Sequence, residues 1–487
     1  MRCIGKEWEN MKKHERRKPT FAEAIIPLIA MFLILSVGYG VCGFPKEAML
    51  VLSAVVTAGM AFYLGATWEE MIETVSEKIA KAMPTILILL AVGIIISSWM
   101  LSGTIPMMIY YGIQIVNPKF FYVTAFIICA VISTCTGTSW GSIGTIGVVL
   151  VIIARGVGLA VPITAGAVVA GSYFGDKMSP LSDTTNLAPL AAGSTLYEHI
   201  RHMFYTTVPA AIGAIIIYTL LGLKAGTDIS VESETVRGMM ENLEQIFHWN
   251  ILLLIPIIIV LAGSVMKKPT IPIMLLSSAV AGFLGIFFQG FTLSDFFEAS
   301  VSGFSMEQVK GIEDMEVLPE ITSLLARGGM NSMLETILLI LCAFSFAGII
   351  TSSGCLDVIL EKLSQVVKNR FSLILSTVVS TVTMAVATGS DFLTILIPGE
   401  LFADVYKRMG YAAKNLSRTL EDSGTCVVAL IPWSAAGAYA SGALGVATAE
   451  YAPFAFFCFF STLMALVCGA TGFGIEKSKK EEDENVK

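Results

Sequence analysis

The sequence predicts an all-α polytopic membrane protein made of two inverted repeats, each with about seven helical segments. Of the 487 residues, 55% are hydrophobic and 14% are charged, whereas about 25% are charged in an average soluble domain. The apolar residues fall in runs of roughly 20, the length at which a helix spans a bilayer. Polar motifs also recur in the two halves of the chain. A net charge of -7 without a basic patch excludes a nucleic-acid-binding protein.

About fourteen apolar segments are expected along the chain. In the first half they are 22–40, 46–65, 84–101, 119–135, 139–153, 159–174 and 205–223. In the second half they are 249–266, 271–288, 334–351, 371–388, 392–405, 424–445 and 451–473. The pattern leaves open whether 119–155 forms two full crossings or one re-entrant hairpin.

The distribution of Lys and Arg over the loops predicts the orientation, because basic loops stay in the cytoplasm. The organisation expected is a cytoplasmic basic arm at 1–21, repeat 1 at 22–223, an acidic external linker at 224–248, repeat 2 at 249–473 and a cytoplasmic tail at 474–487. Both termini are therefore predicted to be cytoplasmic.

The two repeats are recognised by polar motifs rather than by their apolar runs. CTGTS, ending at Ser139, matches ATGSD, ending at Asp391, and SPLS aligns with IPWS at the same offset. TWEEMIE from Thr67 resembles TLSDFFE from Thr292. An odd number of crossings in each repeat would invert the second copy. Inverted repeats are frequent in secondary transporters, whose ion and substrate sites lie near the bilayer midplane.

Four stretches place small and polar residues where apolar ones are expected. They are TCTGTSWGS at 134–142, GSYFGDKMSPLSDTTNLAP at 171–189, TGSD at 388–391 and EDSGTCVVALIPWS at 421–434. Gly and Pro interrupt helical hydrogen bonding. Unwound backbone at membrane depth is tolerated only where protein buries it or where it lines a watery cavity. We therefore expect broken helices or re-entrant hairpins that meet at the midplane.

These breaks contain the candidate ion ligands. A carboxylate inside the membrane is costly and therefore functional by default. Asp176 and Asp183 are the leading carboxylates for Na⁺ and H⁺. The other candidate ligands are Thr136, Thr138, Ser139, Ser179, Ser182, Thr184, Thr185, Asn186, Ser390, Asp391, Asp422, Ser423, Thr425 and Ser434. Oxygen ligands suit a hard cation such as Na⁺. Helix capping is the alternative role for Asp176, Asp183 and Asp391, and an interfacial salt bridge with Arg418 is the alternative for Asp422.

Two further expectations concern the connecting segments. Residues 68–83 have apolar positions at helical spacing with glutamates between them, which predicts a helix lying in the membrane interface. His14, His199, His202 and His248 fall in expected loops, so no histidine proton relay is predicted.

The uninterrupted run DKMSPLSDTTN at 176–186 resembles the NhaC-type sodium/proton antiporter family, within the ion-transporter superfamily of inverted-repeat carriers. This resemblance implies exchange of Na⁺ for H⁺ across the cytoplasmic membrane of a bacterium or archaeon, without a cofactor. Relatives in the superfamily imply a homodimer with an elevator-like movement.

The function expected is therefore a secondary antiporter that exchanges Na⁺ for H⁺ by alternating access, with the lipid bilayer as its surroundings. Carriers similar to this family also exchange small organic acids, such as malate and lactate, so a cation-coupled exchanger of organic acids or amino acids is the first alternative. A membrane-embedded enzyme or a channel is the second. A hydrolase would want a histidine near its nucleophile, and none lies near the serine-rich breaks in sequence.

Overall fold

The computed structural model describes residues 17–115, 117–225, 234–266, 268–312 and 317–478. Within those ranges the regular structure is helical, apart from one bridge between Tyr411 and Lys477. The predicted all-α class is confirmed. Most of the expected basic arm, including His14, lies outside the described residues, as do 226–233 of the expected linker and 479–487 of the expected tail.

The first half of the chain contains α2 (Phe21–Leu33), η1 (Ile34–Val41), α3 (Lys46–Tyr63), α4 (Trp68–Leu101), α5 (Thr104–Ile115), η2 (Pro118–Phe120), α6 (Phe121–Thr136), α7 (Ser139–Ser142), η3 (Ile143–Gly147), α8 (Val148–Val157), α9 (Val161–Met178), α10 (Asp183–Ala192) and α11 (Leu196–Ala225). The second half contains α12 (Glu234–Ile246), η4 (Ile251–Leu254), α13 (Ile255–Val265), α14 (Thr270–Gln289), α15 (Leu293–Ser302), η5 (Met306–Gln308), α16 (Pro319–Leu325), η6 (Met330–Met333), α17 (Leu334–Ser352), α18 (Cys355–Gln365), α19 (Arg370–Thr388), α20 (Asp391–Arg408), α21 (Ala413–Leu420), η7 (Glu421–Thr425), α22 (Cys426–Val428), α23 (Ala435–Leu444), α24 (Thr448–Tyr451), η8 (Ala452–Phe454) and α25 (Phe456–Thr471).

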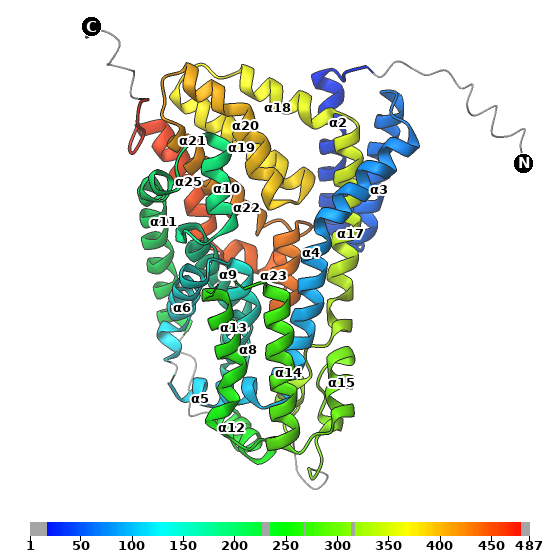
Figure 1. Ribbon diagram of the computed structural model, residues 1–487, viewed down its shortest axis with the longest axis vertical. Coiled ribbons are helices and arrows are strands. Elements are labelled where there is room, and N and C mark those ends of the chain that lie inside the picture. Colours follow the sequence, from blue (N-terminus) through cyan, green and yellow to red (C-terminus); the bar gives the residue numbers. More distant parts are fainter. Residues whose placement is uncertain (1–16, 116, 226–233, 267, 313–316, 479–487) are drawn as a thin grey trace, which may run out of the picture.

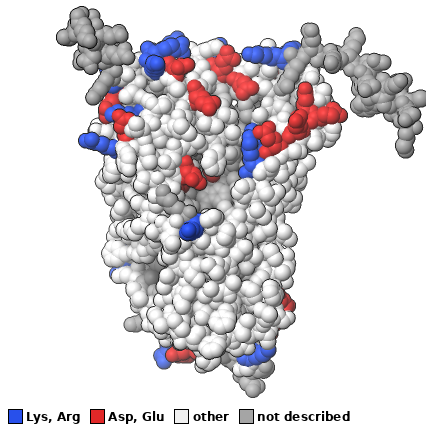
Figure 2. Space-filling model, viewed as in Figure 1, with Lys and Arg blue, Asp and Glu red and all other residues white. Residues whose placement is uncertain are grey.

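The outer surface is that of a multi-pass membrane protein. Nine of the described helices are long and apolar enough to cross a membrane, or up to eleven if each of two bent pairs forms one span. The sequence predicted about fourteen segments. The numbers differ partly because some apolar runs are divided in the structure: 249–266 forms η4 and α13, and 424–445 forms part of η7, α22 and α23. In Figure 2 most charged side chains on the visible face gather at the upper end, fewer lie at the lower end, and the belt between them is nearly free of charge. On α11, Phe204, Val208, Ile212, Ile216 and Leu220 form an exposed apolar stripe that suits contact with lipid.

Two helical hairpins reach the centre from opposite ends of the molecule. The hairpin of α6 and α8 lies in the lower half, and that of α19 and α20 lies in the upper half (Figure 1). Gly137 and Gly389 end α6 and α19 with φ of 71° and 61°, a left-handed conformation that favours glycine. Although 118–136 and 139–157 are each long enough to span a membrane, their opposed placement favours a re-entrant hairpin at 119–155. Hairpins entering from opposite ends are consistent with inverted repeats, and the inversion itself stays a prediction.

Matching positions in the two repeats start helices in the same way. In each case a hydroxyl side chain accepts a hydrogen bond from the backbone N–H of the first helical turn. The matched pairs are Thr67 with Thr292, Thr138 with Ser390, and Ser182 with Ser434. The motifs aligned in the sequence therefore have the same local structure.

The structure corrects two expectations. The interfacial helix predicted at 68–83 is wrong, because α4 continues through Pro84 as one helix of 34 residues that packs against α14, α15 and α17. The loop position predicted for His199 and His202 is also wrong. Thr195 and Glu198 form reciprocal hydrogen bonds that start α11 at Leu196, nine residues earlier than expected, and both histidines are buried in it.

Candidate ion-binding site

Close packing of α6 and α9 brings the first two polar breaks together. A Cβ at Gly171 would lie 2.2 Å from the carbonyl oxygen of Phe126, and one at Gly175 would lie 2.4 Å from that of Ala130. Only glycine permits this approach, as in other tightly packed membrane helices. As a result, the carboxylate of Asp176 accepts a hydrogen bond of 2.9 Å from the hydroxyl of Ser139, at the tip of the first hairpin.

The second hairpin supplies the matching acidic residue. Asp391 is the first residue of α20 and is the counterpart of Ser139 in the sequence alignment. Its Oδ1 atom and the Tyr173 hydroxyl are both buried without a hydrogen-bond partner among the described residues. Asp391 and Tyr173 both interact electrostatically with Asp176. Buried polar atoms normally find a partner, so these two oxygens are candidates for contact with a bound cation.

The chemistry of this group favours a hard cation. Its atoms are carboxylate and hydroxyl oxygens together with the backbone of two helix breaks, which suits Na⁺ better than a soft metal. Among the residues that the structure describes, no three His, Cys, Asp or Glu side chains converge on a metal position. A cation here would thus be held by one or two carboxylates with hydroxyl and carbonyl oxygens.

A second acidic group lies on η7. The Thr184 hydroxyl donates a 3.1 Å hydrogen bond to Oε1 of Glu421. Oε2 of Glu421 and the Thr425 hydroxyl are buried and find no partner in the described parts of the chain. Glu421 interacts electrostatically with Asp176 and Lys177, so this group adjoins the first one.

Lys177, the residue after Asp176, forms a fully buried ion pair with Asp422. The Lys177 ammonium also donates a 2.5 Å hydrogen bond to the Ser461 hydroxyl. Oδ1 of Asp422 accepts further hydrogen bonds from Thr206 (2.9 Å) and Ser461 (3.1 Å). The pair therefore ties α9 to α11, η7 and α25.

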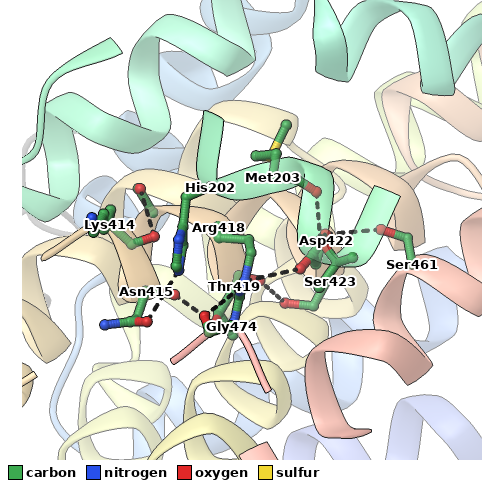
Figure 3. Close-up of polar contacts among 12 residues, drawn as sticks. His202, Met203, Lys414, Asn415, Arg418, Thr419, Asp422, Ser423, Ser461 and Gly474 are labelled. Atoms are coloured by element: carbon green, nitrogen blue, oxygen red, sulfur yellow. Dashed lines mark hydrogen bonds and ion pairs between the residues drawn. The ribbon is translucent and has the colours of Figure 1, made fainter. Parts of the chain in front are cut away.

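A polar network continues from this pair towards the upper end of the molecule. Figure 3 shows Arg418 between Asp422 and Gly474, and its Nη1 donates a 2.7 Å hydrogen bond to the Gly474 carbonyl. The amide oxygen of Asn415 lies 3.1 Å from Nε2 of His202, and the backbone N–H of Glu476 donates to the same oxygen (3.0 Å). A cavity of about 830 Å³ adjoins this end of the network and is lined by His202 and Glu476.

The other predicted ligands fall into two groups. Most of them cap helices or bind backbone in the breaks: Thr136, Thr138, Ser179, Ser182, Thr185, Asn186, Ser390, Ser423 and Ser434. These side chains shape the site through hydrogen bonds to its backbone, with Asn186 donating through its amide nitrogen. Asp183, by contrast, is the first residue of α10 and its side chain is exposed. The structure thus brings Asp176, Ser139 and Asp391 together and leaves Asp183 outside the buried group.

Sequence reasoning overlooked several residues of the network. Lys177, Arg418, Tyr173, Thr206 and Ser461 were not predicted as site residues, although all are buried. One signal was available: His199, His202 and Thr206 recur at i, i+3 and i+7, so they share one face of a helix. That face packs against α21 and η7, where His199 contacts Ser417 at 2.9 Å.

A multi-pass helical protein with broken helices around buried carboxylates has the architecture of a secondary transporter. The family model described as "Na+/H+ antiporter family" matches residues 171–473. The chain belongs to the Na⁺/H⁺ antiporter family.

Named relatives align over nearly the whole chain. An uncharacterized Na⁺/H⁺ antiporter of Haemophilus influenzae is 47% identical over 96% of this chain and 99% of its own length. The Na⁺/H⁺ antiporter NhaC of Alkalihalophilus pseudofirmus is 35% identical over 95% and 98%. The malate-2H⁺/Na⁺-lactate antiporter of Bacillus subtilis is 31% identical over 94% and 96%. The resemblance to NhaC-type proteins seen in the sequence is confirmed.

Proposed function

We propose that this antiporter exchanges Na⁺ for H⁺ at the group formed by Asp176, Asp391, Ser139 and Tyr173. The observation that carries the proposal is a pair of neighbouring carboxylates, Asp176 near the end of α9 and Asp391 at the tip of the second hairpin. Oδ1 of Asp391 is buried without a partner in the described residues. The family and the NhaC relatives support Na⁺ and H⁺ as the exchanged ions.

Competition at the carboxylates explains the exchange. A carboxylate in a poorly solvated site binds either a proton or a cation, because each neutralises its charge. If only a neutralised site reorients across the membrane, every outward Na⁺ is matched by inward protons. No cofactor is needed for this cycle. Lys177 is paired with Asp422, which leaves the carboxylate of Asp176 free for this competition.

The tips of the hairpins are the moving contacts in this proposal. The ring of Trp140 stacks on that of Tyr439 at 4.5 Å, and the Tyr439 hydroxyl donates to the Trp140 carbonyl (2.7 Å). Elements of both repeats thus meet beside the site, as alternating access requires.

The proposal also includes an orientation: the protein lies in the cytoplasmic membrane with both termini in the cytoplasm. The described chain begins and ends at the same end of the molecule (Figure 1). An elevator-like movement and a homodimer complete the proposal.

A second candidate function is cation-coupled exchange of organic acids. The name of the Bacillus subtilis relative favours it, since malate and lactate appear there beside Na⁺ and H⁺. Asp176, Asp391 and Glu421 give the central site a negative character, which favours a bare cation instead. The same negative charge would also disfavour binding of the carboxylate of an amino acid.

A proteoliposome assay tests the proposal. Purified protein is reconstituted with a pH-sensitive dye inside, and Na⁺ is added outside in the absence of carboxylic and amino acids. Proton movement that saturates with Na⁺, and that K⁺ does not support, is the expected result. Proton movement only after malate, lactate or an amino acid is added would establish the second candidate. Large currents uncoupled from protons would indicate a channel.

A further inference from the structure

A second cavity lies at the end of the molecule opposite to the start of α2. Its volume is about 470 Å³, and its lining includes Arg327, Ser302, Ser305 and Ser332. The segments that carry these residues connect α15 to α17, and α15 lies at the lower end of the molecule in Figure 1. In the orientation proposed above, this end faces the outside of the cell.

The backbone around Arg327 is held firmly against α4. The carbonyl of Arg327 accepts a hydrogen bond of 3.0 Å from the N–H of Phe304, and the N–H of Gly329 donates to the carbonyl of Gly93 (2.7 Å). A Cβ at Gly328 would lie 2.4 Å from the backbone nitrogen of Ser97. These contacts fix the backbone from which the Arg327 side chain reaches the cavity wall.

The guanidinium itself has no partner in the described residues. Its Nε atom is buried without a hydrogen bond, and no ion pair involves Arg327 among the described acidic residues. Burial, and secondarily the positive charge of Arg155, lowers the pKa of Arg327 to about 10. A partly buried cation near a second cation and without a counter-ion is unfavourable. An anion in the cavity would relieve that cost.

The other wall of the cavity is the end of α23. A Cβ at Gly445 would lie 2.7 Å from Nη1 of Arg327, so the guanidinium sits against the C-terminus of this helix. The partial negative charge of a helix C-terminus attracts a cation but does not replace hydrogen bonds. A carboxylate presents two oxygens that match the two parallel N–H groups of a guanidinium, and three serines line the same cavity.

We propose that this cavity is an external binding site for a small carboxylate anion, held by Arg327. The site is distinct from the Na⁺/H⁺ group, whose residues do not line it. It joins the 326–333 segment, which is fixed to α4, to the end of α23, the helix that follows the break at 421–434. A bound carboxylate would therefore connect these two segments at the external end.

The test measures binding of malate, lactate and acetate to the purified full-length protein by calorimetry, with chloride as the competing anion. Saturable binding of at least one carboxylate is expected, weakened at least tenfold in R327Q and unchanged in R155Q, whose side chain is exposed nearby. Na⁺-driven proton movement by R327Q in proteoliposomes shows that the variant is folded. Because that assay reports the proposed function separately, the two can fail independently.

Three results would overturn this inference. The first is an absence of carboxylate binding, or binding that R327Q leaves intact. The second is equal competition by chloride, which would make the cavity a general anion site. The third is carboxylate binding that occurs only in E313Q/D314N/E316Q, because the chain's own acidic segment would then be the partner of Arg327.

Discussion

Lys177 and Asp422 form a fully buried ion pair that joins α9 to η7, one residue away from Asp176 and Glu421. The ammonium is also 5.8 Å from the centre of the Phe457 ring. Each of the two proposed acidic groups of the site thus contains a residue that is next in sequence to one member of this buried ion pair. We therefore expect that breaking the pair lowers stability and that changing the neighbouring carboxylates lowers transport.

Removing one member of the pair should destabilise the protein more than removing both. K177Q leaves the buried Asp422 carboxylate with only the more distant guanidinium of Arg418, whose Nε lies 3.9 Å from Oδ2, and we expect a loss of up to about 3–5 kcal/mol. K177Q/D422N, which leaves two neutral amides, should recover part of that loss. Thermal unfolding of the detergent-solubilised proteins measures the difference. Equal melting temperatures for the single and double variants would show that the two charges do not depend on each other.

Neutralising Asp176 or Asp391 should stop exchange. D176N and D391N remove the charge for which Na⁺ and H⁺ compete, so we expect at least a hundredfold lower Na⁺-driven proton flux. D183N is the matched control, because this aspartate lies in the same break but its side chain is exposed. We expect D183N to keep most of the flux. If D183N alone lost transport, Asp183 would be the ion ligand, as its position in the sequence suggests, and Asp391 would not be part of the site.

The apparent affinity for Na⁺ should depend on pH. A proton and Na⁺ compete for the deprotonated site, so acidification raises the apparent KM for Na⁺ and leaves the maximal rate unchanged in the competitive range. One competing proton changes KM by at most about tenfold per pH unit. Initial rates at several Na⁺ concentrations between pH 6 and 9 measure this. A KM independent of pH, with only the maximal rate changing, would place the titrating group elsewhere.

The packing of α6 against α9 should tolerate no side chain at Gly175. In G175A the new Cβ would meet the Ala130 carbonyl oxygen at 2.4 Å and Cβ of Ser133 at 2.6 Å. We expect a loss of about 1–3 kcal/mol and a displaced Asp176 with reduced exchange. Gly59 on α3 has nothing within 4 Å of a Cβ, so G59A is the matched control and should behave as the unaltered protein. Comparable behaviour of the two variants would argue against tight packing of these helices.

The segment at 474–477, the C-terminal strap, should stabilise the buried network. It accepts a hydrogen bond from Arg418 through Gly474, and Glu476 forms an ion pair with Lys414. Ending the chain after Phe473 should lower the melting temperature, because the buried Arg418 would lose its acceptor. Ending it after Lys477 is the control and should have little effect. Equal melting temperatures for the two truncated chains would exclude this role.

The ion pair of the strap should also set its response to acid. Hydrogen bonding from Lys414 holds the pKa of Glu476 below its ordinary value of 4.5. A group with a lowered pKa in the folded state contributes its stability above the ordinary pKa, and that contribution disappears as the pH falls through the folded value. The strap is therefore expected to stay in place from pH 5 to 8 and to weaken only below about pH 4.5, which limited proteolysis across that range can follow.

Much of this protein follows from local sequence. The apolar runs predict membrane helices because bilayer thickness sets their length, and the matched motifs at 135–139 and 387–391 predict equivalent breaks because Gly supplies the same left-handed turn in both. Asp176, Ser139 and Asp391 were candidates because a polar residue inside an apolar span usually has a function.

Only the tertiary structure decided which polar residues meet. Local sequence cannot show that Lys177 pairs with Asp422, because the contact depends on how α9, α11 and α25 pack around η7. It cannot show that Asp183 is exposed while Asp391 has a buried carboxylate oxygen, since both begin a helix after a serine cap. The composition established the membrane environment, and long-range packing determined which few charged side chains are buried.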